Sequence, residues 1–332
     1  MDVERIGIEA DSAGQEFFLR VLRFRGTGEA PTVYLQAALH AHEVPGVVAL
    51  DRLIPRLEQA EGENRLAGDV IVVPQANPVG ASQALFGETQ GRFDFNGRTN
   101  FNRGFPPAGA ETDLARPVDE RLKSTLLSLA CEADIVLDLH CDHDGPVYLY
   151  VHERMLEEGR TLARSLRARA ILTDSGEDPF SFVLKVNQRW NEEGRANDRR
   201  FSATVELRSM IDVTADLAEQ DALGLYRYLV ETGTVVDRLQ EAPAEEPVTG
   251  DIGAAELVLT PAPGAMMLDV EVGEWVAEGQ RLAEIITEAG LERHEIRAPF
   301  EGMVLTRFNR RIVRRGDYVA KILRHERPAS AG

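Results

Sequence analysis

The sequence has little cysteine, no long apolar stretch and a shortage of positive charge. Its two cysteines, Cys131 and Cys141, cannot build a disulfide framework, which fits a reducing compartment such as the cytoplasm. No run of about 18 consecutive apolar residues is present, so a membrane span is not expected. The start of the chain lacks a basic segment followed by an apolar one, so no secretory signal is predicted. We therefore expect a cytoplasmic protein without a membrane partner.

The charge balance narrows the class of partner further. Lys and Arg number 37 against 55 Asp and Glu, which gives a net charge of −18. This balance argues against a nucleic-acid or anionic-membrane binder, so an anionic small molecule would need a local cluster of arginines. With 43% hydrophobic and 28% charged residues the composition is that of a globular protein, and 332 residues allow about two domains. The sequence leaves open whether the chain forms a homo-oligomer.

Residues 1–240 are predicted to form an α/β domain, because strand-like runs alternate with amphipathic helical patterns. The buried strands are expected at residues 32–39, 69–73, 133–139 and 202–207. A long stretch rich in Gly, Asn, Arg and Pro lies between residues 77 and 112, and a loop of that length in a compact domain is usually functional. Residues 241–251, with two prolines and four acids, are predicted to be a linker.

The remaining part, residues 252–328, is predicted to be a small all-β domain built from an internal repeat. The pattern Ala262-Pro-Gly-Ala-Met-Met followed by Gly279 to Ile285 recurs as Ala298-Pro-Phe-Glu-Gly-Met followed by Gly316 to Ile322. Such paired half-units resemble the barrel-sandwich domains of biotinyl and lipoyl carriers. Those carriers need a lysine between the halves, and residues 262–297 contain none. A carrier role is therefore excluded, and a structural or assembly module is expected.

Two of the predicted strands end in residues that suit a metal ion. His40 and Glu43 follow the strand at 32–39 and precede a helix, and His140 closes the strand at 133–139. Side chains at the carboxyl edge of an α/β sheet meet in its binding crevice. Two histidines and one carboxylate leave a fourth position for water, as in catalytic zinc sites. Asp138, in an otherwise apolar strand, could accept the proton of a ligand histidine.

A candidate base lies on the strand at 202–207. Strand alternation places Glu206 on the same face as Thr204 and Arg208, opposite Val205 and its apolar neighbours. A carboxylate at the end of a buried strand could take a proton from zinc-activated water. Arg208 could bind substrate or pair with Glu206, and both interpretations stay open.

The long loop supplies candidate cations for an anionic substrate. Arg92, Arg98, Asn102 and Arg103 lie within fifteen residues of one another in an acidic chain. Arginine grips carboxylates in a bidentate manner, and a neighbouring asparagine adds amide donors.

These motifs, taken in order, resemble the zinc carboxypeptidase superfamily and above all its succinylglutamate desuccinylase/aspartoacylase family. The resemblance rests on His40-x-x-Glu43, Asn102-Arg103, Asp138-Leu-His140 and Glu206, and it includes the linker and the C-terminal β domain. It implies a mixed, largely parallel sheet with helices on both faces. Two departures, Ala41-His42 in the metal loop and Arg208 after the catalytic Glu-Leu, affect the substrate more than the metal.

The resemblance also implies a role for each residue. His40, Glu43 and His140 would hold one zinc ion per chain, and Glu206 would be the catalytic base. Arg92, rather than Arg98, would polarise the scissile carbonyl, while Asn102 and Arg103 would hold a substrate carboxylate. The function expected is hydrolysis of the amide bond of an N-acyl amino acid. Three alternatives stay open: a metallocarboxypeptidase acting on peptides, a diamino-acid deacetylase, and a non-catalytic assembly protein.

Overall fold

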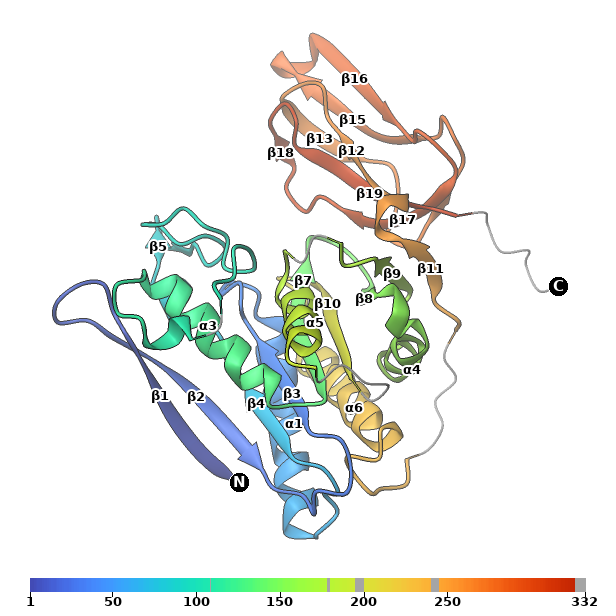
Figure 1. Ribbon diagram of the computed structural model, residues 1–332. Coiled ribbons are helices and arrows are strands. Elements are labelled where there is room, and N and C mark those ends of the chain that lie inside the picture. Colours follow the sequence, from blue (N-terminus) through green and yellow to red (C-terminus); the bar gives the residue numbers. More distant parts are fainter. Residues whose placement is uncertain (108, 178–179, 195–199, 240–244, 326–332) are drawn as a thin grey trace.

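The computed structural model describes residues 1–107, 109–177, 180–194, 200–239 and 245–325. Residues 241–244 of the predicted linker and 326–328 of the predicted β domain lie outside these ranges. The chain begins with a large mixed sheet (Figure 1) whose strands follow the order β1-β2-β4-β3-β7-β10-β8-β9-β11. These strands are Asp2–Glu9 (β1), Glu16–Phe24 (β2), Val33–Ala37 (β3), Val70–Val73 (β4), Ile135–Asp142 (β7), Val147–His152 (β8), Ala170–Asp174 (β9), Phe201–Ser209 (β10) and Val248–Asp251 (β11).

The centre of this sheet is parallel, and this places the candidate site. Strands β4, β3, β7 and β10 run in the same direction, so their carboxyl ends meet at one edge. Strand β8 turns back antiparallel to β10, while β9 and β11 continue parallel to β8. The sheet is thus mixed and largely parallel, as expected. The N-terminal hairpin of β1 and β2, which the sequence analysis did not anticipate, adds an antiparallel edge.

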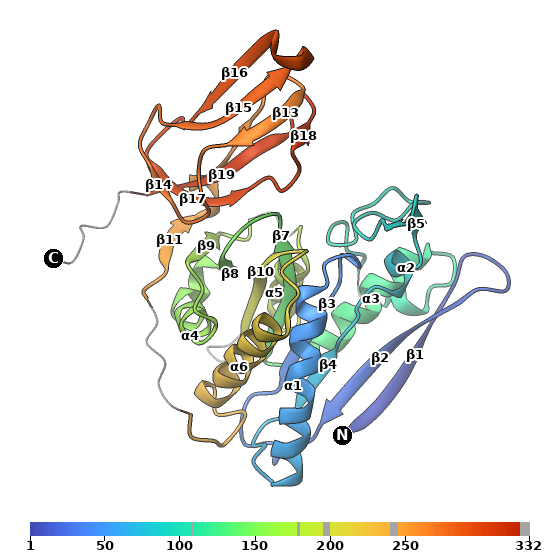
Figure 2. The same cartoon turned by 180° about the vertical axis from the view of Figure 1, so that it is seen from behind.

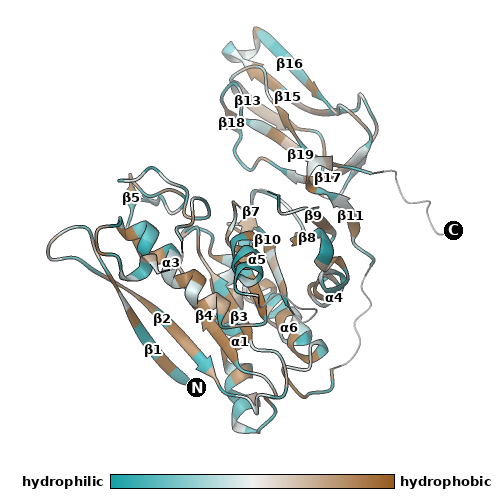
Figure 3. Ribbon diagram, in the orientation of Figure 1, coloured by the Kyte–Doolittle hydropathy of each residue, from teal (hydrophilic) through white to brown (hydrophobic). Residues whose placement is uncertain are grey.

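Helices cover both faces of the sheet. One face packs against α1, α4 and α6, seen in Figure 2, and the other against α3 and α5, seen in Figure 1. Their bounds are Pro45–Gly62 (α1), Pro78–Ala81 (α2), Val118–Cys131 (α3), Leu156–Leu166 (α4), Phe182–Glu192 (α5) and Ala215–Glu231 (α6). Apolar colour runs along the central strands, whereas hydrophilic colour marks the outer helix surfaces (Figure 3). Among the described helices, none has the combined length and apolarity that crossing a membrane requires.

Strand alternation assigns the polar residues of β7 and β10 to one face. Ile135, Leu137 and Leu139 of β7 belong to the core beneath α1, α4 and α6. His140 therefore lies on the face of α3 and α5. Val205 of β10 belongs to the same core as Leu139, so Glu206 lies on the His140 face, and Glu206 is paired with His140 in the strand register. The register of β7 and β10 thus places Glu206 next to His140, as the sequence predicts.

The C-terminal residues form two antiparallel sheets of four strands each, with orders β12-β19-β17-β14 and β16-β15-β13-β18. The two halves of the repeat supply equivalent strands, since β13 pairs with β15 and β18 while β17 pairs with β19 and β14. The bounds are Ala255–Leu259 (β12), Gly264–Leu268 (β13), Trp275–Val276 (β14), Arg281–Thr287 (β15), Glu292–Arg297 (β16), Gly302–Arg307 (β17), Ile312–Val313 (β18) and Tyr318–Arg324 (β19).

This β domain is joined to the large sheet by direct contacts. The last four residues of the predicted linker form β11, which pairs with β9 at the edge of the large sheet. Asp144 and Arg307 exchange two backbone hydrogen bonds of 3.0 and 2.9 Å across the junction. Leu172 and Tyr148 share an apolar cluster with Leu305 of the β domain. The β domain is therefore held over the sheet face on which Glu206 lies.

Candidate active site and metal centre

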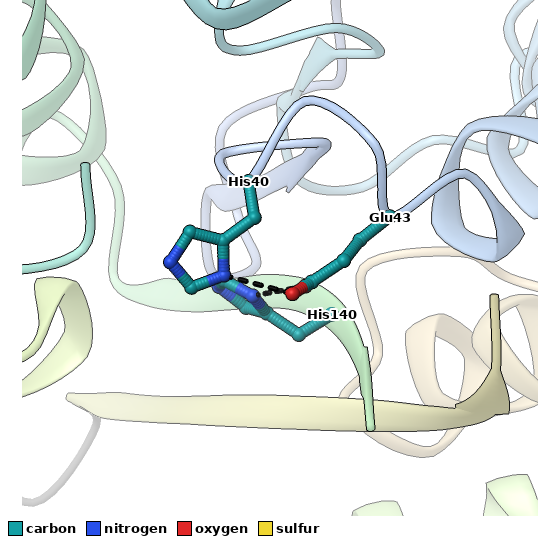
Figure 4. A group of neighbouring side chains, drawn as sticks. All are labelled: His40, Glu43 and His140. Carbon is teal, nitrogen blue, oxygen red and sulfur yellow. Dashed lines mark hydrogen bonds and ion pairs between the residues drawn. The ribbon is translucent and has the colours of Figure 1, made fainter. Parts of the chain in front are cut away.

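Two imidazole rings and one carboxylate converge at the carboxyl edge of the sheet (Figure 4). His40 Nδ1 lies 2.9 Å from Glu43 Oε1, and His140 Nδ1 lies 2.8 Å from Glu43 Oε2. All three residues are buried, and one ligand atom of each lies within 4.8 Å of the other two. The structure therefore brings together the three residues that the sequence predicts as metal ligands.

The loop that carries His40 and Glu43 is shaped by close backbone packing. Ala38 takes a positive φ of 56°, which turns the chain sharply at the end of β3. Pro45 then begins α1 at a position where proline is favoured. A Cβ atom at Gly46 would lie 2.8 Å from Leu139 Cβ, so a larger residue would push α1 away from β7. Gly46 thus allows the loop to approach the strand that ends in His140.

Outer hydrogen bonds fix both imidazole rings. His40 Nε2 lies 2.8 Å from Asn100 Oδ1, and His140 Nε2 lies 2.8 Å from Asp138 Oδ2. Gln36 in turn donates a 2.8 Å hydrogen bond to Asp138. With Nε2 acting as donor to these acceptors, each Nδ1 could offer its lone pair to a metal ion held beside Glu43. Asp138 thus lies where it can accept the proton of His140, which is the role expected for it from the sequence. The sequence analysis did not single out Asn100 as the partner of His40.

The electrostatics of the metal-free cluster suit a cation. Burial raises the pKa of Glu43, but the adjacent His40 and His140 outweigh burial and lower it well below its usual range. Burial lowers the pKa of His140, yet the charges of Asp138 and Glu43 raise it well above its ordinary value. In the absence of a metal a proton on His140 therefore offsets part of the negative charge of Glu43 and Asp138. A divalent ion would displace that proton.

Glu206 lies in the cavity beside this cluster. Burial raises the pKa of its carboxyl to about 8, while the nearby His140 works in the opposite direction. Its Oε2 atom is buried and has no hydrogen-bond partner among the described residues. Glu206 lines the same cavity as His40, Glu43 and His140. A buried, unpaired carboxylate oxygen that faces a cavity can accept a proton from a water or substrate held there.

Two arginines of the long loop also reach the cavity. Arg92 Nη1 lies 3.1 Å from Glu43 Oε1, and its side chain is half exposed. Arg103 packs its guanidinium 4.5 Å from the centre of the Phe180 ring and forms no ion pair with the described residues. Burial and the nearby Arg92 lower the pKa of Arg103. Two neighbouring arginines that repel each other, one of them without a counter-ion among the described residues, could receive an anionic group.

Asn102 also lines the cavity, but its oxygen already has a structural partner. Asn102 Oδ1 accepts a 2.7 Å hydrogen bond from the backbone of Phe182, at the start of α5. Only its amide nitrogen is thus left to donate to a ligand.

Two sequence expectations need correction because of local backbone geometry. Arg98 lies in an exposed turn with a φ of 53°, and it does not line the cavity. Arg208 has a φ of 57° at an irregularity of β10, which breaks the alternation that would have placed it beside Glu206. Its guanidinium forms an ion pair with Asp221 of α6, so it neither lines the cavity nor pairs with Glu206.

The cavity, about 910 Å³ in volume, is completed by the β domain. Tyr318 and Lys321 of β19 line it together with Asp142 and Tyr150 of the α/β domain. His143, a neighbour of the proposed ligand His140, turns instead to Asn309 of the β domain, 2.9 Å away. The sequence analysis did not predict that residues of the β domain line the cavity. The one available signal was Lys321 itself, a lysine in a chain whose cations are almost all arginine.

The fold has known counterparts. Residues 29–232 match the model of the succinylglutamate desuccinylase/aspartoacylase catalytic domain. A crystal structure of a protein of that family from Shewanella amazonensis superposes with a TM-score of 0.83 at 25% identity, covering 97% of this chain and 98% of the other. The product-bound ectoine utilization protein EutE (DoeB) from Ruegeria pomeroyi shares the fold, with a TM-score of 0.74 at 20% identity over 96% and 92% of the chains.

The chain therefore belongs to the succinylglutamate desuccinylase/aspartoacylase family, whose members are amide-cleaving hydrolases. Among characterised relatives, it is similar to the N-alpha-acetyl-L-2,4-diaminobutyric acid deacetylase of Halomonas elongata. The two are 27% identical over 301 residues, which cover 89% of this chain and 82% of the relative. These findings place the chain in the class of amide hydrolases and not among assembly proteins.

Proposed function

We propose that this protein is a zinc-dependent hydrolase that removes the acyl group from an N-acyl amino acid. The observation that supports this most directly is the buried cluster of His40, Glu43 and His140 next to the unpaired carboxylate oxygen of Glu206. The donor set of two imidazole nitrogens and a carboxylate oxygen is that of catalytic zinc. The fit is good because both Nδ1 atoms already point toward Glu43, while both Nε2 atoms have outer partners.

The positions of the cavity residues support the following roles. When bound, one zinc ion per chain would supply Lewis-acid activation of water and of the substrate carbonyl. Glu206 accepts the proton from the attacking water and passes it to the departing amine. Arg92, beside Glu43, donates to the carbonyl oxygen as negative charge develops on it. Each of these groups lines the same cavity, so no large movement is needed to assemble them.

The same cavity holds the substrate by its carboxylate. Arg103 lacks an acidic partner among the described residues, and the amide nitrogen of Asn102 is available next to it. We propose that these two residues bind the carboxylate of the amino acid, which fixes the scissile amide relative to the metal. The protein as a whole is acidic, so this local positive charge is what attracts an anionic substrate.

A diamino-acid deacetylase is the second candidate, because a relative of that activity covers most of the chain. Both candidates use the same ligands, base and carboxylate anchor, and they differ in whether the cavity accepts a second amine.

We place the enzyme in the cytoplasm, since Cys131 and Cys141 are both buried as thiols.

A hydrolysis screen tests the proposal. Purified protein loaded with zinc is incubated with N-acetyl, N-succinyl and N-formyl amino acids, and the released amine is measured. Peptides with free and blocked carboxyl termini are included, because a metallocarboxypeptidase would cleave the former. We expect hydrolysis of at least one N-acyl amino acid, loss of activity after chelation, and recovery with one zinc per chain. Cleavage of peptides alone, or activity unaffected by chelation, would contradict the proposal.

A further inference from the structure

Lys321 brings a positive charge from the β domain into the catalytic cavity. Its Nζ atom lies 2.6 Å from Asp142 Oδ2, 3.1 Å from the Tyr148 hydroxyl and 3.3 Å from the Tyr150 hydroxyl. The Lys321 side chain is 14% exposed and that of Asp142 is 17% exposed. Both residues line the cavity that contains Glu206 and the proposed metal ligands. The ammonium group is therefore a fixed part of the cavity wall.

Asp142 has no acceptor capacity left for a substrate. Its Oδ2 atom accepts from Lys321 and, at 2.7 Å, from the Tyr148 hydroxyl. Its Oδ1 atom accepts a 2.8 Å hydrogen bond from the backbone of His143 and a longer one from the Tyr318 hydroxyl. A substrate ammonium could not bind this carboxylate without displacing Lys321.

The other acids of the cavity are committed or remote. Glu43 belongs to the proposed metal cluster and Glu206 is the proposed base. Glu88 also lines the cavity, but it is exposed, so water screens its charge and it compensates an ammonium for little of its lost hydration. Strand β8 lies between β9 and β10. Asp174 of β9 is paired with His152 of β8, and Glu206 of β10 is paired with Tyr148, which lies four residues before His152 on β8. With two strand spacings between them, the Cα atoms of Asp174 and Glu206 are about 16 Å apart. The backbone position of Asp174 is therefore far from that of Glu206, and we expect an amine a few bonds from the scissile amide to lie short of Asp174.

We infer that Lys321 is a specificity-determining residue that excludes N-acyl amino acids with a cationic side chain and directs the enzyme to those with a neutral or anionic side chain. The inference rests on the proposed function and names its substrate class. A second ammonium group in the cavity would lose its hydration and lie near the Lys321 ammonium, while Asp142, already bonded to Lys321, could not pair with it. A neutral side chain of the same shape carries neither penalty.

Two substrates of equal shape test the selectivity of the wild-type enzyme. N-acetyl-L-norvaline and N-alpha-acetyl-L-2,4-diaminobutyrate differ only in a terminal methyl against an ammonium group. We expect the zinc-loaded enzyme to favour norvaline in kcat/KM by at least about tenfold, equivalent to about 1.4 kcal/mol. Equal use of both substrates, or preference for diaminobutyrate, would overturn the inference while leaving the proposed function intact. Failure to hydrolyse any N-acyl amino acid would instead remove the proposed function, and the inference with it.

Variants then test whether Lys321 causes this selectivity. Lys321→Met removes the ammonium and frees Asp142, so the ratio of kcat/KM values should move toward diaminobutyrate by about tenfold or more. Lys321→Arg keeps the charge and should keep the exclusion. Adding Asp142→Asn to Lys321→Met should abolish the shift, because the carboxylate that receives the substrate amine is then lost.

The matched control is Lys185→Met. Lys185 bonds to Gln188 on α5 and does not line the cavity, so the ratio should stay at the wild-type value. Zinc content and thermal midpoint are measured for every variant. A folded, zinc-loaded Lys321→Met enzyme with an unchanged ratio would refute the role of Lys321. If that variant does not fold, Lys321→Gln, which removes the charge but keeps a polar group beside Asp142, takes its place, and an unchanged ratio in it would refute the role of Lys321.

Discussion

Replacing Glu206 by glutamine should separate catalysis, metal binding and stability in one variant. Glutamine keeps the size of the side chain but cannot accept a proton as a base. General-base catalysis contributes about 10²- to 10⁴-fold to enzymatic rates, so we expect kcat to fall by at least about 10²-fold. Glu206 is not in the cluster of His40, Glu43 and His140, so the zinc content should stay at one per chain.

The same substitution should stabilise the metal-free protein, and the magnitude follows from burial. The pKa of Glu206 is raised from 4.5 to about 8 in the folded state, whereas the unfolded chain ionises near 4.5. An acid with a raised pKa favours the unfolded state increasingly as the pH rises from 4.5 to about 8. At pH 7 this shift corresponds to about 3 kcal/mol of lost stability. Glutamine does not ionise and avoids that cost.

Urea denaturation in the presence of a chelator measures this effect. The free energy of unfolding of Glu206→Gln should exceed that of the wild type by about 3 kcal/mol at pH 7, and the difference should vanish near pH 4. Both proteins share every other titrating group, so the difference reports the ionisation of Glu206 together with its effect on the nearby His140. A variant that keeps wild-type turnover would refute the assignment of the base. A variant that is destabilised at pH 7 would refute the description of Glu206 as a buried, unpaired acid.

Three further substitutions test other parts of the site. Asp138→Asn weakens the acceptor that orients His140 and should lower zinc affinity about 10- to 100-fold, as measured by competition with a chromogenic chelator. Arg103→Ala should raise KM for N-acyl amino acids about 10- to 100-fold, because a charge-assisted hydrogen bond to the substrate carboxylate is lost; an unchanged KM would remove Arg103 from substrate binding. Arg208→Ala leaves Asp221 buried without its cation, so the free energy of unfolding should fall by about 3 kcal/mol while kcat/KM is retained. A large loss of activity in folded Arg208→Ala would return this residue to the active site.

The sequence by itself determined the elements that bear the chemistry. Buried apolar runs located β3, β4, β7 and β10, and the polar residues at the ends of β3 and β7 indicated where a metal could bind. These inferences succeeded because strand periodicity and the common edge of parallel strands are local or topological properties, which a sequence pattern can express. The internal repeat of the β domain was visible for the same reason, since equivalent strands carry similar residues.

Only the tertiary structure decided which side chains face the cavity. A positive φ at Arg208 reversed the direction that simple alternation predicts, and an ion pair with Asp221 of the following helix α6 stabilises that direction. Lys321 entered the site because the β domain packs over β8, far from it in sequence. Such contacts depend on how separate units dock, and no local pattern encodes the approach of residues that lie 179 positions apart, as Asp142 and Lys321 do.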